Sequence, residues 1–370
     1  MNVHKRIWKT LNHEEPDRVP TFTQSIEQPF CKRYDEEVGV PDEIVDAMLP
    51  GMTFDLIFAK ALGYDSKWVH LSSGSAPKRE HPELPELPEG QKVNASGHVY
   101  VTNKRGQAWY YDGALKTPEL IKAWIPFIKD YIPPDASYYK NFKDMWDKGI
   151  DNGLLPIPTV GGVVYTSWSA IGMKRFGYMV RKHFDLVSQL FHAWGDRTIE
   201  AQSILFEQGV DMVFICEDFA QKDRLMMSPK HWEELTIPVY KKITKNAHKH
   251  GAKLLVHTDG NIDEAFPGMI EAGVDAAEPL EYESGMRLKP LKEKYGDKIT
   301  LIGNVPASEA LCIQDVDYTV NITKTCIKDA AEGGGFILSQ GANLLANTKI
   351  ENVQAMIETV KRYGTYPIKL

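Results

Sequence analysis

Apolar residues recur in the C-terminal two thirds of the chain as short runs, separated by longer amphipathic stretches. Runs of this length and composition predict buried strands, and the stretches between them predict helices. The expected strands are Leu155–Val164, Asp211–Cys216, Lys253–His257, Val274–Glu278, Ile299–Gly303 and Gly335–Leu338, with a further short one at Arg18–Phe22. This alternation favours parallel pairing with right-handed crossovers.

Several helix ends can be predicted from single residues. The first twelve residues predict a helix, and Ser228 ahead of Pro229 predicts the N-cap and first position of another. Pro238 is expected to kink or end that second helix. Thr348–Glu351 fits a capping box that opens the last helix, which is expected to end at Gly364.

Two α/β architectures satisfy this pattern, the doubly wound sheet and the closed (β/α)8 TIM-like barrel. No GxGxxG or Walker loop follows a predicted strand, so the barrel is favoured, as one domain over residues 1–370. Residues 65–151 are interpreted as an insertion or N-terminal cap. Within them, His98–Thr102 and Gln107–Tyr111 predict a β-hairpin joined through Asn103–Gly106.

Composition narrows the function classes. With 43% hydrophobic and 25% charged residues, the chain resembles an ordinary globular protein. A formal net charge of -7 argues against nucleic acid or anionic lipid as a partner. No apolar run is long enough to span a bilayer, and the N-terminus lacks the apolar centre of a secretory signal. The four cysteines form no CxxC pair, which favours reduced thiols and a cytoplasmic location.

Polar residues end successive predicted strands, where barrel enzymes place their chemistry. One strand ends in His257-Thr258-Asp259-Gly260, its neighbours end in Glu217-Asp218 and Glu278, and later ends carry Asn304 and Ser339. Each taken alone has an ordinary structural explanation, since an acid after a strand often caps the next helix and a single His is often only hydrogen-bonded. Together, however, several carboxylates at one rim require a compensating cation.

Two kinds of cation would serve. Lys222, Arg224 and Arg287 are candidate basic partners. The other solution is a divalent metal bound by His257 and one or two carboxylates, and such a ligand set suits zinc with an open position.

At these residues the sequence resembles the uroporphyrinogen decarboxylase superfamily, and the resemblance covers almost the whole chain. The residues that carry it are Arg6–Trp8, Leu11–Pro20, Ser228-Pro229, Trp232, His257–Asn261, Gly273–Ala276, Leu291-Lys292, Tyr295–Asp297, Gly333–Leu338 and Glu351-Asn352. The resemblance implies a distorted (β/α)8 barrel. It also implies one of two chemistries, decarboxylation or corrinoid-dependent methyl transfer.

The decarboxylases of this superfamily carry an arginine-rich segment near the N-terminus that grips the substrate's propionates. The corresponding stretch here, Thr21–Gln28, has no arginine and contains Glu27. A polyanionic tetrapyrrole would find no clamp there. Decarboxylation of uroporphyrinogen is therefore disfavoured.

The thiol-using methyltransferases of the second branch bind zinc through His-x-Cys and a later Cys. Here Asp259 stands where the first Cys would be, and Ser339-Gln340 stand near the place of the second, with Cys312 too far along the chain to replace it. A harder, oxygen-rich site is better suited to a substrate oxygen than to a thiolate. Loss of the metal is the competing explanation of the same departure.

The resulting hypothesis is a corrinoid-dependent methyltransferase that moves methyl from a methyl ether, of the methoxylated aromatic type, to a cobalt(I) corrinoid protein. His257, Glu217 and Glu278 are the expected zinc ligands, and Asp259 is a ligand or orienting group. Asn304 is expected to position the substrate. The alternatives are corrinoid-to-thiol transfer, a metal-free decarboxylase and a binding or regulatory protein on a decayed barrel. The sequence specifies neither the donor nor the oligomeric state.

Overall fold

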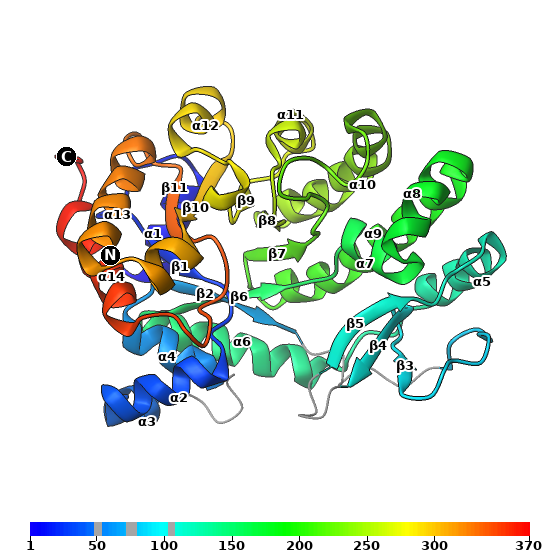
Figure 1. Cartoon of the computed structure of the whole chain (residues 1–370), viewed down its shortest axis with the longest axis horizontal. Coiled ribbons are helices and arrows are strands. Elements are labelled where there is room, and N and C mark those ends of the chain that lie inside the picture. Colours follow the sequence, from blue (N-terminus) through cyan, green and yellow to red (C-terminus); the bar gives the residue numbers. More distant parts are fainter. Residues whose placement is uncertain (48–53, 72–79, 103–107) are drawn as a thin grey trace.

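The computed structural model describes residues 1–47, 54–71, 80–102 and 108–370. Eight parallel strands close into a barrel in the order β1-β11-β10-β9-β8-β7-β6-β2 (Figure 1). These strands are β1 Thr21–Thr23, β2 Ser66–His70, β6 Leu155–Thr159, β7 Met212–Cys216, β8 Lys253–His257, β9 Ala276–Glu278, β10 Thr300–Val305 and β11 Phe336–Gln340. The predicted (β/α)8 TIM-like barrel is confirmed.

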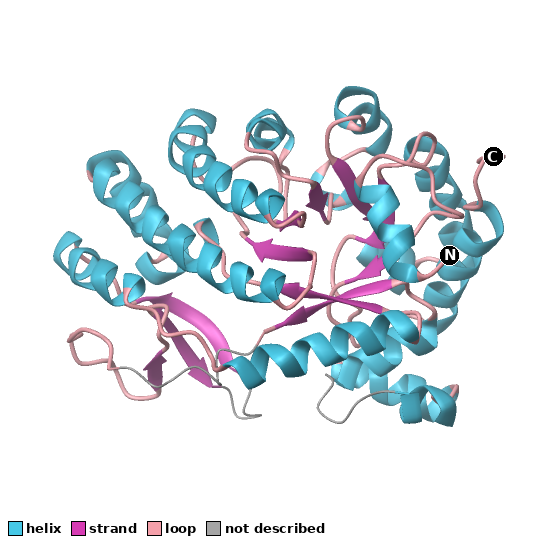
Figure 2. Cartoon of the chain, turned by 180° about the vertical axis from the view of Figure 1, so that it is seen from behind, coloured by secondary structure: helices cyan, strands magenta, loops and turns pink. Residues whose placement is uncertain are grey.

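Helices surround the strands on the outside of the barrel (Figure 2). They are α1 Val3–Leu11, α2 Gln28–Glu37, α3 Asp42–Ala47, α4 Phe54–Leu62, α5 Pro118–Lys129, α6 Ala136–Asp151, α7 Val164–Ile171, α8 Met173–Lys182, α9 Phe184–Glu207, α10 Pro229–Lys249, α11 Phe266–Glu271, α12 Leu288–Tyr295, α13 Val316–Ala330 and α14 Ile350–Tyr363. Short helical turns occur at Asp263–Ala265, Tyr282–Ser284 and Glu309–Ile313. None of the helices in the described ranges is long and apolar enough to cross a membrane.

Three aromatic side chains fill the barrel interior below its carboxyl rim. The ring of Phe22 lies 5.2 Å from that of Phe214 and 6.4 Å from that of Trp68, measured between centroids. All three side chains are buried. Trp68 also meets His257 edge to face at 4.7 Å, so the aromatic cluster forms the floor on which the His257 ring rests.

The strand β2 was not predicted, because its sequence does not read as an apolar run. Its Lys67 is buried, with the ammonium 2.8 Å from a carboxylate oxygen of Asp55. Burial is therefore possible here only because a distant acid pairs with the lysine. β2 also lies inside residues 65–151, so the range predicted as an insertion begins with a barrel strand.

The remainder of that range contains a separate antiparallel sheet, β3 Gln91–Val93, β4 His98–Thr102 and β5 Ala108–Gly113. β4 and β5 pair as the predicted hairpin strands do, and Figure 1 shows this sheet beside α7. The predicted turn at 103–106 lies outside the described residues. The division of the chain into one barrel domain and an inserted cap stays a prediction.

The predicted helix ends met with mixed results. Ser228 caps α10 through a hydrogen bond from the backbone N–H of His231, and α14 ends at Gly364 as expected. Pro238 does not end α10, which continues to Lys249. The predicted capping box was wrong. The hydroxyl of Thr348 accepts a hydrogen bond from the backbone N–H of Leu345, in the preceding loop, rather than from a backbone N–H of the helix.

One buried network ties the first strand into the barrel. Asp65, just before β2, accepts hydrogen bonds from Arg6 at 2.8 Å, from Arg18 at 2.7 and 2.8 Å, and from the backbone of Thr21 at 2.9 Å. Asp65 is 2% exposed and Arg6 is 8% exposed. One carboxylate thus joins α1, the approach to β1 and the start of β2.

We expect Asp65→Asn to destabilise the fold by roughly 3 kcal/mol, because it leaves two guanidinium groups without their shared anion. Urea denaturation measures this change. The matched control is Asp144→Asn in the exposed Lys140–Asp144 pair, which should cost about 0.5 kcal/mol or less. Equal effects of the two substitutions would contradict the assigned role of Asp65.

Candidate metal centre

The ends of three adjacent strands bring acidic and imidazole side chains together. In the ladder, Cys216 of β7 is opposite His257 of β8, and His257 is opposite Glu278 of β9. The residues that immediately follow these positions therefore share one stretch of the barrel rim.

His257 is held by a buried carboxylate. Its Nδ1–H donates to an oxygen of Glu278 at 2.6 Å, and the other oxygen of Glu278 accepts from the amide of Gln24 at 2.8 Å. Glu278 is fully buried, and His257 is 5% exposed. Because Nδ1 serves as the donor, Nε2 is turned toward the rim, as in carboxylate–histidine–metal arrangements.

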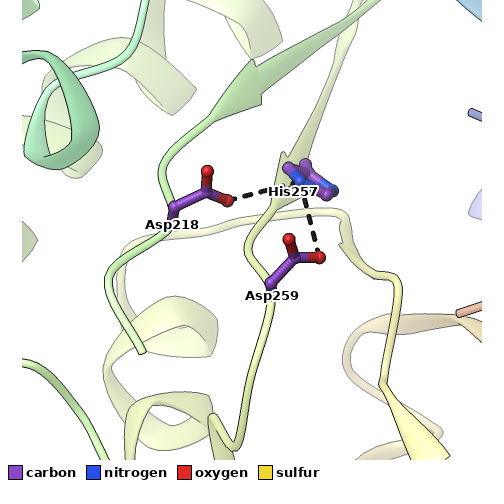
Figure 3. A group of neighbouring side chains, drawn as sticks. All are labelled: Asp218, His257 and Asp259. Carbon is purple, nitrogen blue, oxygen red and sulfur yellow. Dashed lines mark ion pairs between the residues drawn. The ribbon is translucent and has the colours of Figure 1, made fainter. Parts of the chain in front are cut away.

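Two aspartates face that Nε2 atom (Figure 3). It lies 3.4 Å from Oδ1 of Asp218 and 3.8 Å from Oδ1 of Asp259. The three ligand atoms lie within 4.8 Å of one another, and we call these residues the His257 group. Oδ1 of Asp218 is buried and accepts no hydrogen bond from the described residues. A buried carboxylate oxygen in this state is suited to a cation.

The pKa values follow from this crowding. Burial works against protonation of His257, but Glu278 and Asp218 outweigh it and raise the pKa of His257 well above its ordinary value. Burial, opposed by His257 and reinforced by Asp218, raises the pKa of Asp259 to about 7. Solvent moderates that shift, because the Asp259 side chain is 54% exposed.

The donor set is one imidazole nitrogen and two carboxylate oxygens. Three protein ligands of these types are what catalytic zinc sites use, with a further position left for substrate. The residues therefore fit a divalent metal. Two of the three basic partners considered from the sequence have other contacts, since Arg224 pairs with Asp223 at 3.9 Å and Arg287 covers the ring of Tyr282.

The structure does not bring Glu217 into the group. Its carboxylate accepts from the backbone N–H groups of Val163, Val164 and Tyr165 at distances between 2.6 and 3.3 Å. It thus caps the N-terminus of α7, where a negative charge is favourable. The next residue, Asp218, takes the place predicted for Glu217 in the group.

Two further predicted residues have other partners. Glu278 is not one of the grouped ligands but orients His257. The amide of Asn304 donates to the carbonyl oxygens of Leu280 and Met286, 3.2 Å away in the second case. Asn304 therefore braces the connection after β9, and its predicted role in positioning a substrate gains no support.

Sequence reasoning missed the residues that hold Asp218 in place. The backbone of Asp218 has a φ of 37°, which is a left-handed conformation that costs energy for a residue other than glycine. The indole N–H of Trp168 donates to its carbonyl oxygen at 3.0 Å, and the Thr258 hydroxyl accepts from the N–H of Phe219 at 3.1 Å. No local pattern indicated Trp168, because it comes from α7.

Comparison with known proteins assigns the chain to a family. A family model described as uroporphyrinogen decarboxylase (URO-D) matches residues 156–363, more than half of the chain. The match includes every strand that carries the His257 group. The fold is a parallel barrel whose rim carries side chains that could bind a metal ion. The chain belongs to the uroporphyrinogen decarboxylase family. The family resemblance noted in the sequence is confirmed.

Two curated relatives share the name methylcobamide:CoM methyltransferase MtaA. The protein from Methanosarcina barkeri (strain Fusaro / DSM 804) is 24% identical over 210 residues, covering 56% of this chain and 59% of the relative. A second from Methanosarcina barkeri is 23% identical over the same shares. The match thus spans less than two thirds of the length of these relatives.

Among solved structures, a methyltransferase from Methanosarcina mazei has a TM-score of 0.66 at 20% identity, covering 98% of this chain and 99% of that one. A B12-independent methionine synthase from Shewanella sp. W3-18-1 has a TM-score of 0.50 at 12% identity, with 93% and 98% covered. At these identities the likeness concerns the fold alone.

We expect Asp218→Asn to weaken zinc binding by at least about tenfold, because a neutral amide is a poor metal ligand. Glu217→Gln should instead leave zinc affinity little changed and lower stability by about 1–2 kcal/mol, through the weakened cap of α7. Competition with a zinc indicator and thermal melts separate the two effects. Zinc loss in Glu217→Gln with retention in Asp218→Asn would reverse the assignment.

Trp168→Phe should also weaken zinc binding, by about tenfold, because the left-handed backbone at Asp218 loses its indole donor. The control is Trp109→Phe on β5, whose side chain is 59% exposed. Unchanged zinc affinity in a folded Trp168→Phe protein would rule out this positioning role.

Proposed function

We propose that this protein is the methyltransferase component of a corrinoid-dependent system and takes methyl from an oxygen, as in a methoxylated aromatic ether. Three findings support the proposal: membership of the family, the names of the curated relatives, and the ligand atoms of the His257 group. The observation that carries the choice of an ether is that this group contains one nitrogen and two oxygens, with no sulphur.

The positions where thiol-using members of the family carry cysteine hold other residues here. Asp259 belongs to the His257 group. At the end of β11 the Ser339 hydroxyl donates to the carbonyl oxygen of Gln340, and the Gln340 amide donates to Thr23 at 2.6 Å. Both side chains are therefore occupied within the barrel wall.

The cysteines of the described residues do not supply a substitute. Burial raises the pKa of the Cys216 thiol to about 12, and its sulphur is not among the grouped ligand atoms. Cys312 lies with its sulphur 3.6 Å from the hydroxyl of Thr348. A hard, oxygen-rich site of this kind favours a substrate oxygen over a thiolate.

The chain's own residues would hold the cation and close the floor of the site. Glu278 keeps the His257 ring oriented, while Asp218 and Asp259 provide the negative charge. Trp68 under the His257 ring excludes water from below. Zinc bound by this group would supply a Lewis acid that polarises the ether oxygen of the methyl donor.

The methyl acceptor in this proposal is cobalt(I) of a corrinoid carried by a partner protein that docks over the barrel mouth. Cobalt supplies the electron pair that forms the cobalt–carbon bond as the carbon–oxygen bond breaks. The departing oxygen keeps the electron pair of the broken bond and leaves as a phenolate or alkoxide, which takes a proton from water. The overall products are a methylated corrinoid and an alcohol or phenol.

Transfer from a methylated corrinoid to a thiol is the second candidate, because both curated relatives are named for a methyl transfer to CoM. The decarboxylation implied by the family name is less favoured. In the segment where the decarboxylases carry arginines, Gln24 binds the buried carboxylate of Glu278. That segment therefore serves the His257 group rather than a polyanionic substrate.

The zinc-loaded protein, mixed with cob(I)alamin and a panel of methoxylated aromatics, should convert the cobalt(I) spectrum to that of methylcobalamin and release a phenol. His257→Ala should lower this rate by at least about a hundredfold, because the cation loses its nitrogen ligand. The surface variant Asp144→Asn should retain it. Methylation of thiols from methylcobalamin, with no reaction from any ether, would refute ether demethylation and support the second candidate.

A further inference from the structure

Tyr165 lies beside the His257 group without belonging to it. It occupies the first turn of α7, where its backbone N–H donates to the carboxylate of Glu217 at 3.3 Å. Its ring centre lies 5.2 Å from that of Trp168, the residue whose indole N–H donates to the carbonyl oxygen of Asp218 at 3.0 Å. The Tyr165 ring is therefore one contact away from a residue that we assign to the cation.

Two neighbouring rings fix the direction of the Tyr165 side chain. His98 of β4 and Trp168 both meet it edge to face, at 5.6 and 5.2 Å between ring centres and an interplanar angle of 90° in each case. Contacts of this geometry are favourable for aromatic pairs. Ser169 joins the same unit, since its hydroxyl donates to the carbonyl oxygen of Tyr165 and is hydrogen-bonded to Nε2 of His98 at 2.8 Å. The antiparallel sheet thus helps to hold the Tyr165 ring in place.

The phenol oxygen of Tyr165 is open to a ligand. In the described part of the chain it makes no hydrogen bond, yet it is not among the buried atoms that lack a partner, so solvent reaches it. Tyr110, in the same aromatic cluster, instead donates to the carbonyl oxygen of Ser169 at 3.0 Å. Burial, reinforced by the charges of Asp218 and Cys216, raises the pKa of Tyr165, which places its phenol within electrostatic reach of the end of β7.

We propose that the Tyr165 hydroxyl donates a hydrogen bond to the substrate oxygen at the His257 group and makes this site select oxygen over sulphur. The inference rests on the proposed function and deepens it by naming the residue that recognises the oxygen. As the carbon–oxygen bond breaks, its electron pair stays on the oxygen, and a fixed donor stabilises that developing charge. The phenol keeps its proton, so the step needs no further reactant.

The selectivity follows from the acceptor strengths of oxygen and sulphur. A phenolate oxygen accepts a strong, charge-assisted hydrogen bond. Sulphur is a weak acceptor, so the same hydroxyl adds little to the binding of a thiolate. Asp218 and Asp259 act on the cation, whereas Tyr165 acts on the substrate. Loss of the Tyr165 hydroxyl should therefore change the discrimination between ligands without changing the affinity for zinc.

Binding of phenol and thiophenol to the zinc-loaded full chain tests this inference without cobalt. Calorimetric titration should show one phenol bound, with a Kd of about 1 mM or tighter. Tyr165→Phe keeps the ring and removes the donor, so it should weaken phenol by at least about tenfold. Thiophenol should lose less than about twofold. The zinc affinity and the melting temperature should match those of the wild type, which verifies that the ring still packs.

The matched control is Tyr178→Phe, the same chemical change on α8 at a side chain that is 56% exposed. It should leave the binding of both ligands unchanged. Absence of phenol binding to the zinc-loaded wild type would overturn the inference, and so would an equal loss of phenol and thiophenol in Tyr165→Phe. A loss of zinc in that variant would also overturn it, because it would assign Tyr165 a structural role.

The two proposals fail in different ways. A wild-type protein that binds no zinc would contradict the cation site itself, whereas one that binds zinc but not phenol would contradict the role of Tyr165 alone. A selective loss of phenol in Tyr165→Phe would support that role even if the cobalt assay showed no reaction with any ether.

Discussion

The barrel depends on the closure made by its shortest strands. β1 is three residues long, yet it must pair with β11 on one side and β2 on the other, and a single carboxylate, Asp65, holds its start against β2 and α1. A closed parallel barrel directs all its carboxyl ends to one rim. The meeting of β7, β8 and β9 side chains at His257 is a consequence of that closure, since the strands reach the rim in register.

The His257 group shows how one strand end can serve two purposes. Glu217 and Asp218 are adjacent, and their side chains contact different partners. The first satisfies the N-terminal N–H groups of α7, and the second turns to His257. The two roles support each other, because α7 also supplies the Trp168 indole that holds the left-handed backbone of Asp218. Stability of the helix and geometry of the group are thus produced by the same short segment.

Enzymes with many different reactions share this barrel fold, so the side chains of the His257 group, rather than the fold, indicate the chemistry of this chain. Oxygen ligands around a buried, carboxylate-oriented histidine create a hard site, and Phe22, Trp68 and Phe214 form an aromatic floor beneath it.

The sequence by itself determined the alternation of strands and helices, except for β2, and the residues available at the rim. Those features follow from local periodicity and local composition, and this is why Lys253–His257 was predicted with its observed bounds. It also placed His257 and Asp259 at one strand end, and these are the two sequence-nominated residues that the His257 group keeps. The tertiary structure decided the rest.

The choice between Glu217 and Asp218 depended on where the N-terminus of α7 lies. The turning of Asn304 toward backbone carbonyls depended on the connection after β9, and the burial of Lys67 in β2 depended on Asp55. A carboxylate or amide goes to whichever unsatisfied partner the fold brings within hydrogen-bond distance. For these side chains the partner is distant in sequence, so no local pattern could identify it.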